Sequence, residues 1–153
     1  MSTKMNIAGS APFIAVPTFI YLVITTVISL NDKPFYTIDE KHYGILIALG
    51  IVLIIIGILM VVNCARKLHK SFKPGLLMKD GLYKVFRNPM YAAYMLFIIP
   101  GISLLFNSWI VLTTVLLNYI LFSIFIKREH KYLEEKFGSE YQSYLEKVFI
   151  RFL

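Results

Sequence analysis

Four apolar stretches follow one another along the chain, separated by short polar segments. They cover residues 11–30, 43–64, 89–106 and 109–126. A transmembrane α-helix needs about 20 apolar residues, with a range of about 17–25, and each stretch falls within that range. The pattern therefore predicts an all-α fold, a polytopic membrane protein with about four transmembrane helices. In this interpretation the whole chain, residues 1–153, forms a single membrane domain.

The third and fourth stretches are expected to form a helical hairpin, because only Asn107 and Ser108 separate them. Trp109 follows this turn, at a place where an aromatic ring fits the membrane interface. Beyond the fourth stretch, residues 127–150 alternate between charged and apolar positions. Gly138 is expected to end one helix there, and a new short helix follows it. The pattern predicts a C-terminal cytoplasmic amphipathic helix resting on the lipid headgroups.

Composition agrees with a membrane protein, and charge indicates its orientation. Of the 153 residues, 58% are hydrophobic and only 16% are charged, whereas a soluble domain of this length needs more polar surface. Seven basic residues lie in 65–88 and six lie from Lys127 onwards, against two in 31–42. The positive-inside rule therefore predicts that both termini and the second loop face the cytoplasm. These loops account for the net charge of +7, so we expect membrane lipids and no nucleic acid as partners.

Two polar residues, Arg87 and Asn88, and the helix breaker Pro89 stand where the third apolar stretch begins. One interpretation is a simple helix start, because Asn is a good N-cap and Pro is favoured at the first helical position. Arg87 would then reach lipid phosphate, and Tyr91 would belong to the interfacial aromatic belt. The second interpretation is a site, because a helix N-terminus beside an arginine favours an anionic or carboxylate group.

An acidic residue, Glu129, lies within one turn of the end of the fourth stretch. A carboxylate at that depth is costly without a partner, which makes it a candidate site residue. The other interpretation is a solvated helix on the headgroups. Both polar neighbourhoods lie at the cytoplasmic ends of one hairpin, so we expect them to meet. Arginine and aromatic rings on one side and a carboxylate on the other suit a zwitterionic or sulfonium-bearing ligand.

Metal and thiol chemistry find no support in the sequence. Cys64 is the single cysteine and lies near the end of the second apolar stretch, where a packed side chain is the expected role. Its position offers no disulfide and no metal pair. No His, Cys and Asp cluster has the spacing of a metal site, so none is expected.

Two motifs, taken in order, resemble a group of membrane methyltransferases. They are GLYKVFRNPMYAAY, residues 81–94, and, after the hairpin, REHKYLEEKFGSEYQSYLEKV, residues 128–148. Their order resembles the pattern G-P-Y-x-x-x-R-H-P-x-Y-x-G, hairpin, E-E-x-x-L-x-x-x-F-G-x-x-Y-x-x-Y of the isoprenylcysteine carboxyl methyltransferase and phospholipid N-methyltransferase group. The resemblance covers about residues 44–148. The chain departs from the pattern at four positions, Leu82, Asn88, Ala93 and His130, where the group has Pro, His, Gly and Glu.

The resemblance implies a membrane methyltransferase with S-adenosylmethionine as cofactor and an active site that faces the cytoplasm. The acceptor it implies is lipidic, either a prenylcysteine-like carboxylate or a phospholipid amine. Arg87 and Glu129 are expected to take part in catalysis. Carried over position by position, the expected cofactor-binding residues are Tyr83, Arg87, Asn88, Pro89, Tyr91, Glu129 and His130.

Two other functions stay open from the sequence. Steroid-reductase-like membrane oxidoreductases carry similar patterns and use NADPH, so binding of NADPH but not of S-adenosylmethionine would favour that class. A non-catalytic small membrane scaffold is allowed by the departures at Asn88, Ala93 and His130. Binding of neither cofactor by a well-folded protein would favour the scaffold.

Overall fold

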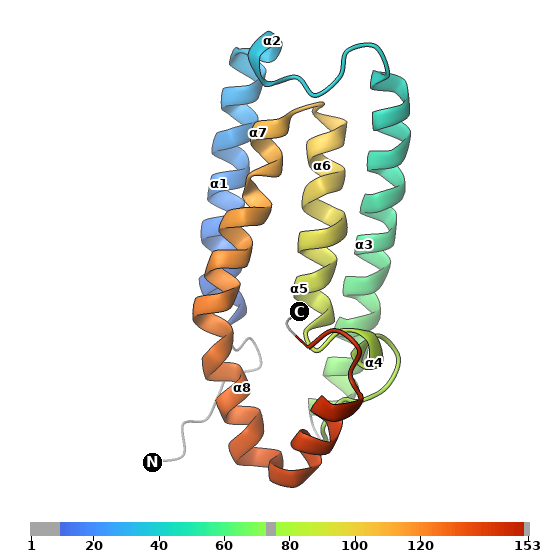
Figure 1. Cartoon of the computed structure of the whole chain (residues 1–153), viewed down its shortest axis with the longest axis vertical. Helices are drawn as coiled ribbons and strands as arrows, with labels where there is room; N and C mark the ends of the chain where they lie inside the picture. Colours follow the sequence, from blue (N-terminus) through green and yellow to red (C-terminus); the bar gives the residue numbers. More distant parts are fainter. Residues whose placement is uncertain (1–9, 73–75, 152–153) are drawn as a thin grey trace.

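The computed structural model describes residues 10–72 and 76–151, and the predicted cytoplasmic residues 1–9 lie outside this part. Figure 1 shows long helices running side by side, with short helices at both ends of the bundle. The all-α prediction is confirmed for the described residues. In chain order the helices are α1 (Ala11–Asn31), α2 (Lys33–Tyr36), α3 (Tyr43–Phe72), α4 (Leu82–Val85), α5 (Pro89–Ala93), η1 (Tyr94–Ile98), α6 (Ile99–Leu105), α7 (Trp109–Leu112) and α8 (Thr114–Lys147).

Two pairs of long helices build the bundle. The hairpin helix formed by α5, η1 and α6 packs along α3, whereas α8 packs along α1. Small residues let the first pair approach closely: a Cβ added to Gly101 would lie 2.8 Å from the carbonyl oxygen of Gly50. Close backbone contact through small residues is a common way for helices to associate within a membrane.

The hairpin helix contains a π-helical turn, η1, between α5 and α6. Pro100 follows this turn in the first turn of α6 and has no N–H to donate. A π-helical turn and a proline are both recognised causes of a kink in a helix. Tyr94, the first residue of η1, lines the cavity described below.

A polar seam joins α1 to the α7–α8 helix. Three hydrogen bonds join the two helices, two of them between side chains and one from a side chain to a backbone oxygen, with donor–acceptor distances of 2.9–3.1 Å. Interhelical hydrogen bonds of this kind stabilise membrane bundles by about 0.6 kcal/mol each on average. The bonds join Ser10 Oγ to the carbonyl oxygen of Phe125, Tyr21 OH to Thr113 Oγ1, and Asn118 Nδ2 to Thr18 Oγ1.

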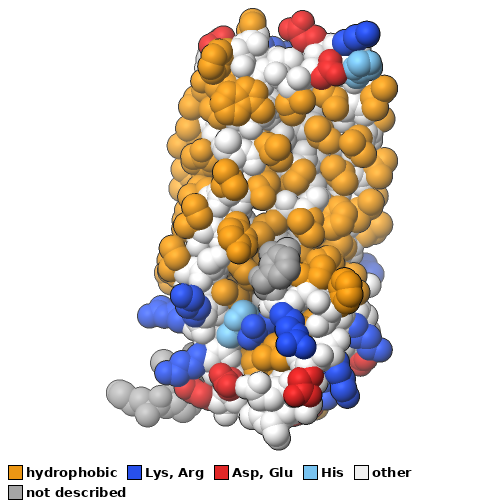
Figure 2. All heavy atoms as spheres, viewed as in Figure 1, with side chains coloured by type: hydrophobic (Ala, Val, Ile, Leu, Met, Phe, Trp, Pro, Cys, Tyr) orange, Lys and Arg blue, Asp and Glu red, His pale blue; other side chains and the backbone are white. Residues whose placement is uncertain are grey.

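The outer surface carries an apolar band with charged residues at its two ends (Figure 2). Three helical segments of the described chain are long and apolar enough to cross a membrane: Ala11–Asn31, Tyr43–Leu68 and Trp109–Lys147. The predicted third span corresponds to a shorter apolar helix, Pro89–Leu105. At 1.5 Å per residue its length is about 26 Å, slightly below the thickness of a typical hydrocarbon core.

The fourth apolar stretch and the tail helix predicted after it form one continuous helix as far as Gly138. Helix α8 continues past the apolar stretch to Lys147, because residues 127–137 are good helix formers and leaving the bilayer does not itself end a helix. The predicted interruption at Gly138 is confirmed: its φ of 47° and ψ of −120° are not helical. The chain turns there and returns toward α4 (Figure 1).

At the end of the bundle away from α4, Trp109 and Asn107 make hydrogen bonds to the segment between α1 and α3. The indole N–H of Trp109 donates to the carbonyl oxygen of Phe35 at 3.2 Å. Asn107, with a φ of 49°, exchanges two hydrogen bonds with the backbone of Asp39, at 2.8 and 3.0 Å. These contacts tie the hairpin turn to the loop between α2 and α3, at the end of the bundle away from α4.

Candidate functional site

A cavity of about 870 Å³ lies among α1, α3, the hairpin helix and the end of α8. Cavities of about 300–1,000 Å³ are typical of small-molecule and cofactor sites. One part of its wall is polar and contains Tyr83, Arg87 and Glu129, whereas most of the rest is apolar. Phe19 and Ile20 line the cavity and are also exposed on the outer surface, so the cavity opens toward the apolar band.

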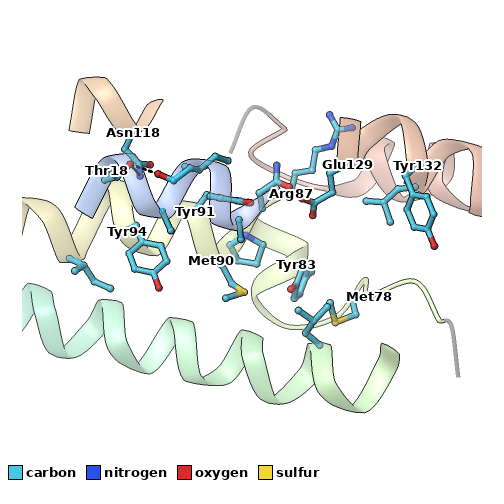
Figure 3. Close-up of a pocket in the computed structure, with 18 of the residues that line it drawn as sticks. Thr18, Met78, Tyr83, Arg87, Met90, Tyr91, Tyr94, Asn118, Glu129 and Tyr132 are labelled. Atoms are coloured by element: carbon cyan, nitrogen blue, oxygen red, sulfur yellow. Dashed lines mark hydrogen bonds between the residues drawn. The ribbon is translucent and has the colours of Figure 1, made fainter. Parts of the chain in front are cut away.

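The structure brings the two predicted neighbourhoods together. Figure 3 shows labelled side chains from both, among them Arg87 and Tyr91 from one side and Glu129 from the other. Of the predicted site residues, His130 does not line the cavity but contacts one residue that does. The six that line the cavity are Tyr83, Arg87, Asn88, Pro89, Tyr91 and Glu129.

Asn88 occupies the N-cap position of α5, and Pro89 takes the first helical position, as the sequence predicts. The expected side-chain cap is absent, however: the Asn88 side chain makes no capping hydrogen bond. Its Nδ2 atom instead lies 3.3 Å from Nε2 of His130 on α8. The two positions where the chain departs most from the resembled motif thus form one contact across the hairpin.

Arg87 points into the protein and contacts the segment after Gly138. Its Nε and Nη2 atoms donate to the hydroxyl of Tyr141 at 3.1 and 2.7 Å, and its guanidinium lies 5.4 Å from the centre of that ring. Tyr141 is almost fully buried, with 1% of its surface exposed. The interpretation in which Arg87 simply reaches lipid phosphate is therefore wrong.

Residues 139–151, here called the C-terminal strap, bind back onto α4 and the residues that follow it. The Tyr144 hydroxyl donates to the carbonyl oxygen of Tyr83 at 2.8 Å. Backbone bonds extend the contact: Ile150 N–H donates to the Val85 oxygen at 2.7 Å, and Arg87 N–H donates to the Ile150 oxygen at 3.0 Å. The strap thereby fixes the segment that carries Tyr83 and Arg87.

Tyr141 and Tyr144 belong to the second motif and to the predicted amphipathic helix, but the sequence analysis did not count them among the site residues. Both line the cavity, and both belong to a small buried cluster with Val148. The available signal was their spacing of three residues together with a hydroxyl on each ring, because a buried tyrosine hydroxyl usually needs a hydrogen-bond partner.

Glu129 lies just beyond the apolar part of α8, which ends at Ile126. Burial raises the pKa of its carboxyl group, and the backbone N–H of Ser10 opposes that rise. No ion pair with Glu129 is present among the described residues. A half-buried carboxylate of this kind is suited to receive a cationic ligand, because a nearby positive charge favours its ionised form.

The single cysteine and the possibility of a metal site were also considered in the sequence analysis. Cys64 is free and fully buried, in agreement with the packed side chain that the sequence predicts. Within residues 10–72 and 76–151, no group of three or more His, Cys, Asp or Glu side chains could hold a metal ion.

Comparison with known proteins identifies the family. The family model described as phospholipid methyltransferase matches residues 45–140, which is more than half of the chain. The chain belongs to the phospholipid methyltransferase family. The resemblance of the two motifs to this group of membrane methyltransferases is thereby confirmed. The match includes α5 and Glu129, but it leaves out α1 and the C-terminal strap beyond residue 140.

Curated relatives of this phospholipid methyltransferase family member come from rice. Two proteins, from Oryza sativa subsp. indica and subsp. japonica, carry the description probable protein-S-isoprenylcysteine O-methyltransferase. Each is 30% identical over 123 residues, which cover 72% of this chain and 62% of the relative. The chain thus spans less than two thirds of the length of these relatives. No solved structure matches it significantly. The family and the apolar helices together identify an integral membrane protein.

His130 gives this family member a testable dependence on pH. Burial, with Arg87 nearby, lowers the pKa of His130 from 6.5 to about 4. The unfolded chain therefore takes up a proton below pH 6.5 that the folded chain takes up only near pH 4, so stability falls over this interval as pH falls. We expect the apparent Tm in detergent to fall from pH 7 to pH 4, and less steeply in His130→Gln. Equal slopes in the two proteins would contradict this expectation.

Proposed function

We propose that the protein transfers a methyl group from S-adenosylmethionine to a lipidic acceptor. The observation that carries the proposal is that Arg87 and Glu129 both lie in the polar wall of a cavity that is otherwise mostly apolar. Family membership supports methyl transfer, and the descriptions of the rice relatives support a membrane-associated acceptor. The acceptor is either a carboxylate on a lipid-modified cysteine or the amine of a phospholipid.

The residues of the polar wall fit the proposed cofactor. Arg87 provides a guanidinium for its carboxylate, and Glu129 provides a carboxylate for its cationic groups. Tyr83 and Tyr91 present aromatic rings, which attract a sulfonium or ammonium by cation–π interaction. When bound, S-adenosylmethionine supplies an activated methyl carbon, which the acceptor oxygen or nitrogen attacks while the carbon–sulfur bond breaks and its electron pair stays on sulfur.

The protein itself has to position the two substrates, exclude water from them and, for an amine acceptor, take up a proton. Apolar walls exclude water from the reacting groups, and alignment of the two substrates lowers the entropic part of the barrier. For an amine acceptor, Glu129 takes the proton that leaves nitrogen, a role for which its raised pKa is suited. For a carboxylate acceptor no proton has to be removed, and Arg87 orients the acceptor.

The proposed arrangement in the membrane follows from the distribution of charge and the shape of the cavity. The polar wall lies at the end of the bundle that carries most basic residues, which the positive-inside rule assigns to the cytoplasm. Pro89–Leu105, the third span in chain order, also crosses the membrane, which gives four crossings. This helix is slightly shorter than the bilayer is thick. The lipidic acceptor enters sideways, past the exposed residues Phe19 and Ile20 of α1.

Titration calorimetry of the purified protein in detergent tests the proposal, combined with radiolabelled methyl transfer to lipid extracts. We expect saturable binding of S-adenosylmethionine and label in a lipid fraction. Absence of binding to a folded protein would overturn the proposal. Binding of NADPH alone would favour a steroid-reductase-like oxidoreductase, and binding of neither cofactor would favour a scaffold.

A further inference from the structure

One polar side chain lies in the part of the hairpin helix that lines the apolar region of the cavity. Beyond Tyr91, which belongs to the polar wall, the cavity-lining residues of Pro89–Leu105 are apolar except Tyr94. Ile98 and Ile102 continue the same wall further along the helix. The Tyr94 side chain is accessible, with 39% of its surface exposed, so a ligand in the cavity can contact it.

The π-helical turn η1 begins at Tyr94. The N–H of Ile99 donates to the carbonyl oxygen of Tyr94, one residue further back along the chain than in an α-helix. Single π-helical turns inside α-helices are frequent at functional sites. Figure 3 shows the Tyr94 ring pointing away from the hairpin helix, with its hydroxyl at the tip. The hydroxyl is therefore the part of this residue that a bound ligand would contact first.

The depth of Tyr94 relative to the polar wall follows from a contact between the two helices. Asn88 Nδ2 lies 3.3 Å from Nε2 of His130, so Asn88 and Glu129, the neighbour of His130 on α8, lie at about the same level. Tyr94 follows Asn88 by six residues, which is about 9 Å along the helix axis. Tyr94 therefore lies deeper in the bundle than Glu129 by about that distance.

An ester-linked phospholipid carries hydrogen-bond acceptors at a matching distance. In phosphatidylethanolamine the phosphate and glycerol groups separate the amine from the ester carbonyls by about 10 Å when extended, since each single bond is about 1.5 Å long. With the amine at Glu129, these carbonyls reach the level of Tyr94. A phenol O–H can donate to a carbonyl oxygen, and apolar surroundings strengthen such a bond. A prenyl chain is a hydrocarbon and offers no acceptor there.

We propose that Tyr94 is a specificity-determining residue whose hydroxyl donates a hydrogen bond to an ester carbonyl of the acceptor and so favours a lipid with ester-linked acyl chains. The inference rests on the proposed function, because it places the reacting group of the acceptor at Glu129 and its chain in the apolar part of the cavity. Of the two acceptors proposed above, Tyr94 favours the phospholipid amine over the prenylcysteine-like carboxylate.

A pair of phosphatidylethanolamines tests this inference. They share headgroup, chain length and unsaturation, but one has ester-linked chains and the other has ether-linked chains, which lack the carbonyl groups. Competition of each lipid against a fluorescent phospholipid, with the protein in detergent micelles, measures relative affinity without any methyl transfer. We expect the wild-type protein to prefer the ester-linked lipid about fivefold, the size of effect that one hydrogen bond has on binding. No preference in the wild-type protein would overturn the inference, whatever the variants do.

Two variants assign the preference to the Tyr94 hydroxyl. Tyr94→Phe is expected to bind both lipids equally, because it keeps the ring and removes only the donor. Tyr119→Phe, at an exposed tyrosine of α8 that does not line the cavity, is the matched control and should keep the wild-type preference. A preference that survives in Tyr94→Phe, or that Tyr119→Phe also abolishes, would overturn the assignment.

Methyl transfer to the same two lipids and to a farnesylated cysteine separates this inference from the proposed function. Preferential binding of the ester-linked lipid, with no methylation of any of the three, would support the role of Tyr94 and count against the methyltransferase proposal. Equal binding and equal methylation of the two lipids would support the methyltransferase proposal and overturn the role of Tyr94. Methylation of the farnesylated cysteine alone would have the same two consequences.

Discussion

Replacement of Glu129 by glutamine is expected to weaken binding of S-adenosylmethionine by at least about tenfold, because a hydrogen bond to a charged group contributes about 1.5–3 kcal/mol. The carboxylate lies in the polar wall of the cavity without an ion pair among the described residues, so its charge is available to a cationic ligand. Glutamine keeps the shape of the side chain and removes the charge. Calorimetry of both proteins in the same detergent measures the difference in Kd.

Stability gives the internal control for this variant. Burial disfavours the ionised form of Glu129, so the neutral amide should leave the apparent Tm unchanged or slightly higher. Loss of affinity together with loss of Tm would point to a damaged fold and contradict a direct role. Glu135→Gln, at an exposed position on the same helix, is the matched control and should bind the cofactor like the wild-type protein.

The raised pKa of Glu129 adds a second signature to the same experiment. As pH falls, a carboxyl group with a raised pKa takes up a proton earlier than an ordinary glutamate, and its charge is lost. Affinity of the wild-type protein for the cationic cofactor should therefore fall in mildly acidic solution, and Glu129→Gln should show a flatter profile. Identical pH profiles would contradict binding through the Glu129 carboxylate.

Much of the fold could be predicted from the sequence because it depends on the length and spacing of apolar stretches. The bilayer sets the length of a crossing helix, so the four apolar stretches were visible without any knowledge of packing. The sequence predicted a helix before and after residue 126, but it did not show that the two are continuous. Polarity changes at Ile126, yet the backbone hydrogen bonds of α8 continue, and only Gly138 interrupts them.

The place of the candidate site could be predicted from the sequence, but its side-chain contacts could not. The motifs indicated Arg87 and Glu129, and the hairpin explained why they meet. The partner of Arg87 was hidden, because Tyr141 lies 54 positions away and reaches Arg87 only after the chain turns at Gly138. The orientation of Asn88 was hidden for the same reason: local rules favour a helix cap, but contact with His130 across the hairpin prevails.

Arg87→Lys is expected to reduce affinity for S-adenosylmethionine by about tenfold or more, although it keeps the positive charge. Arginine donates from two nitrogens to the Tyr141 hydroxyl and lies against that ring, and the rest of its planar group remains to bind a carboxylate. A lysine ammonium is a single point charge that cannot make both sets of contacts. Calorimetry measures the loss, and Arg128→Lys, at an exposed arginine one residue before Glu129, should have no effect.

Tyr141→Phe separates the position of Arg87 from its charge. Phenylalanine keeps the buried ring and removes the hydroxyl that holds the guanidinium, so Arg87 stays charged but loses two hydrogen bonds. We expect an intermediate loss of cofactor affinity, smaller than in Arg87→Lys, and no further loss when the two changes are combined. Independent losses that add in the double variant would show that Tyr141 acts on the cofactor separately, because additivity is expected only for residues that do not share an interaction. Wild-type affinity in Arg87→Lys would remove Arg87 from the proposed site altogether.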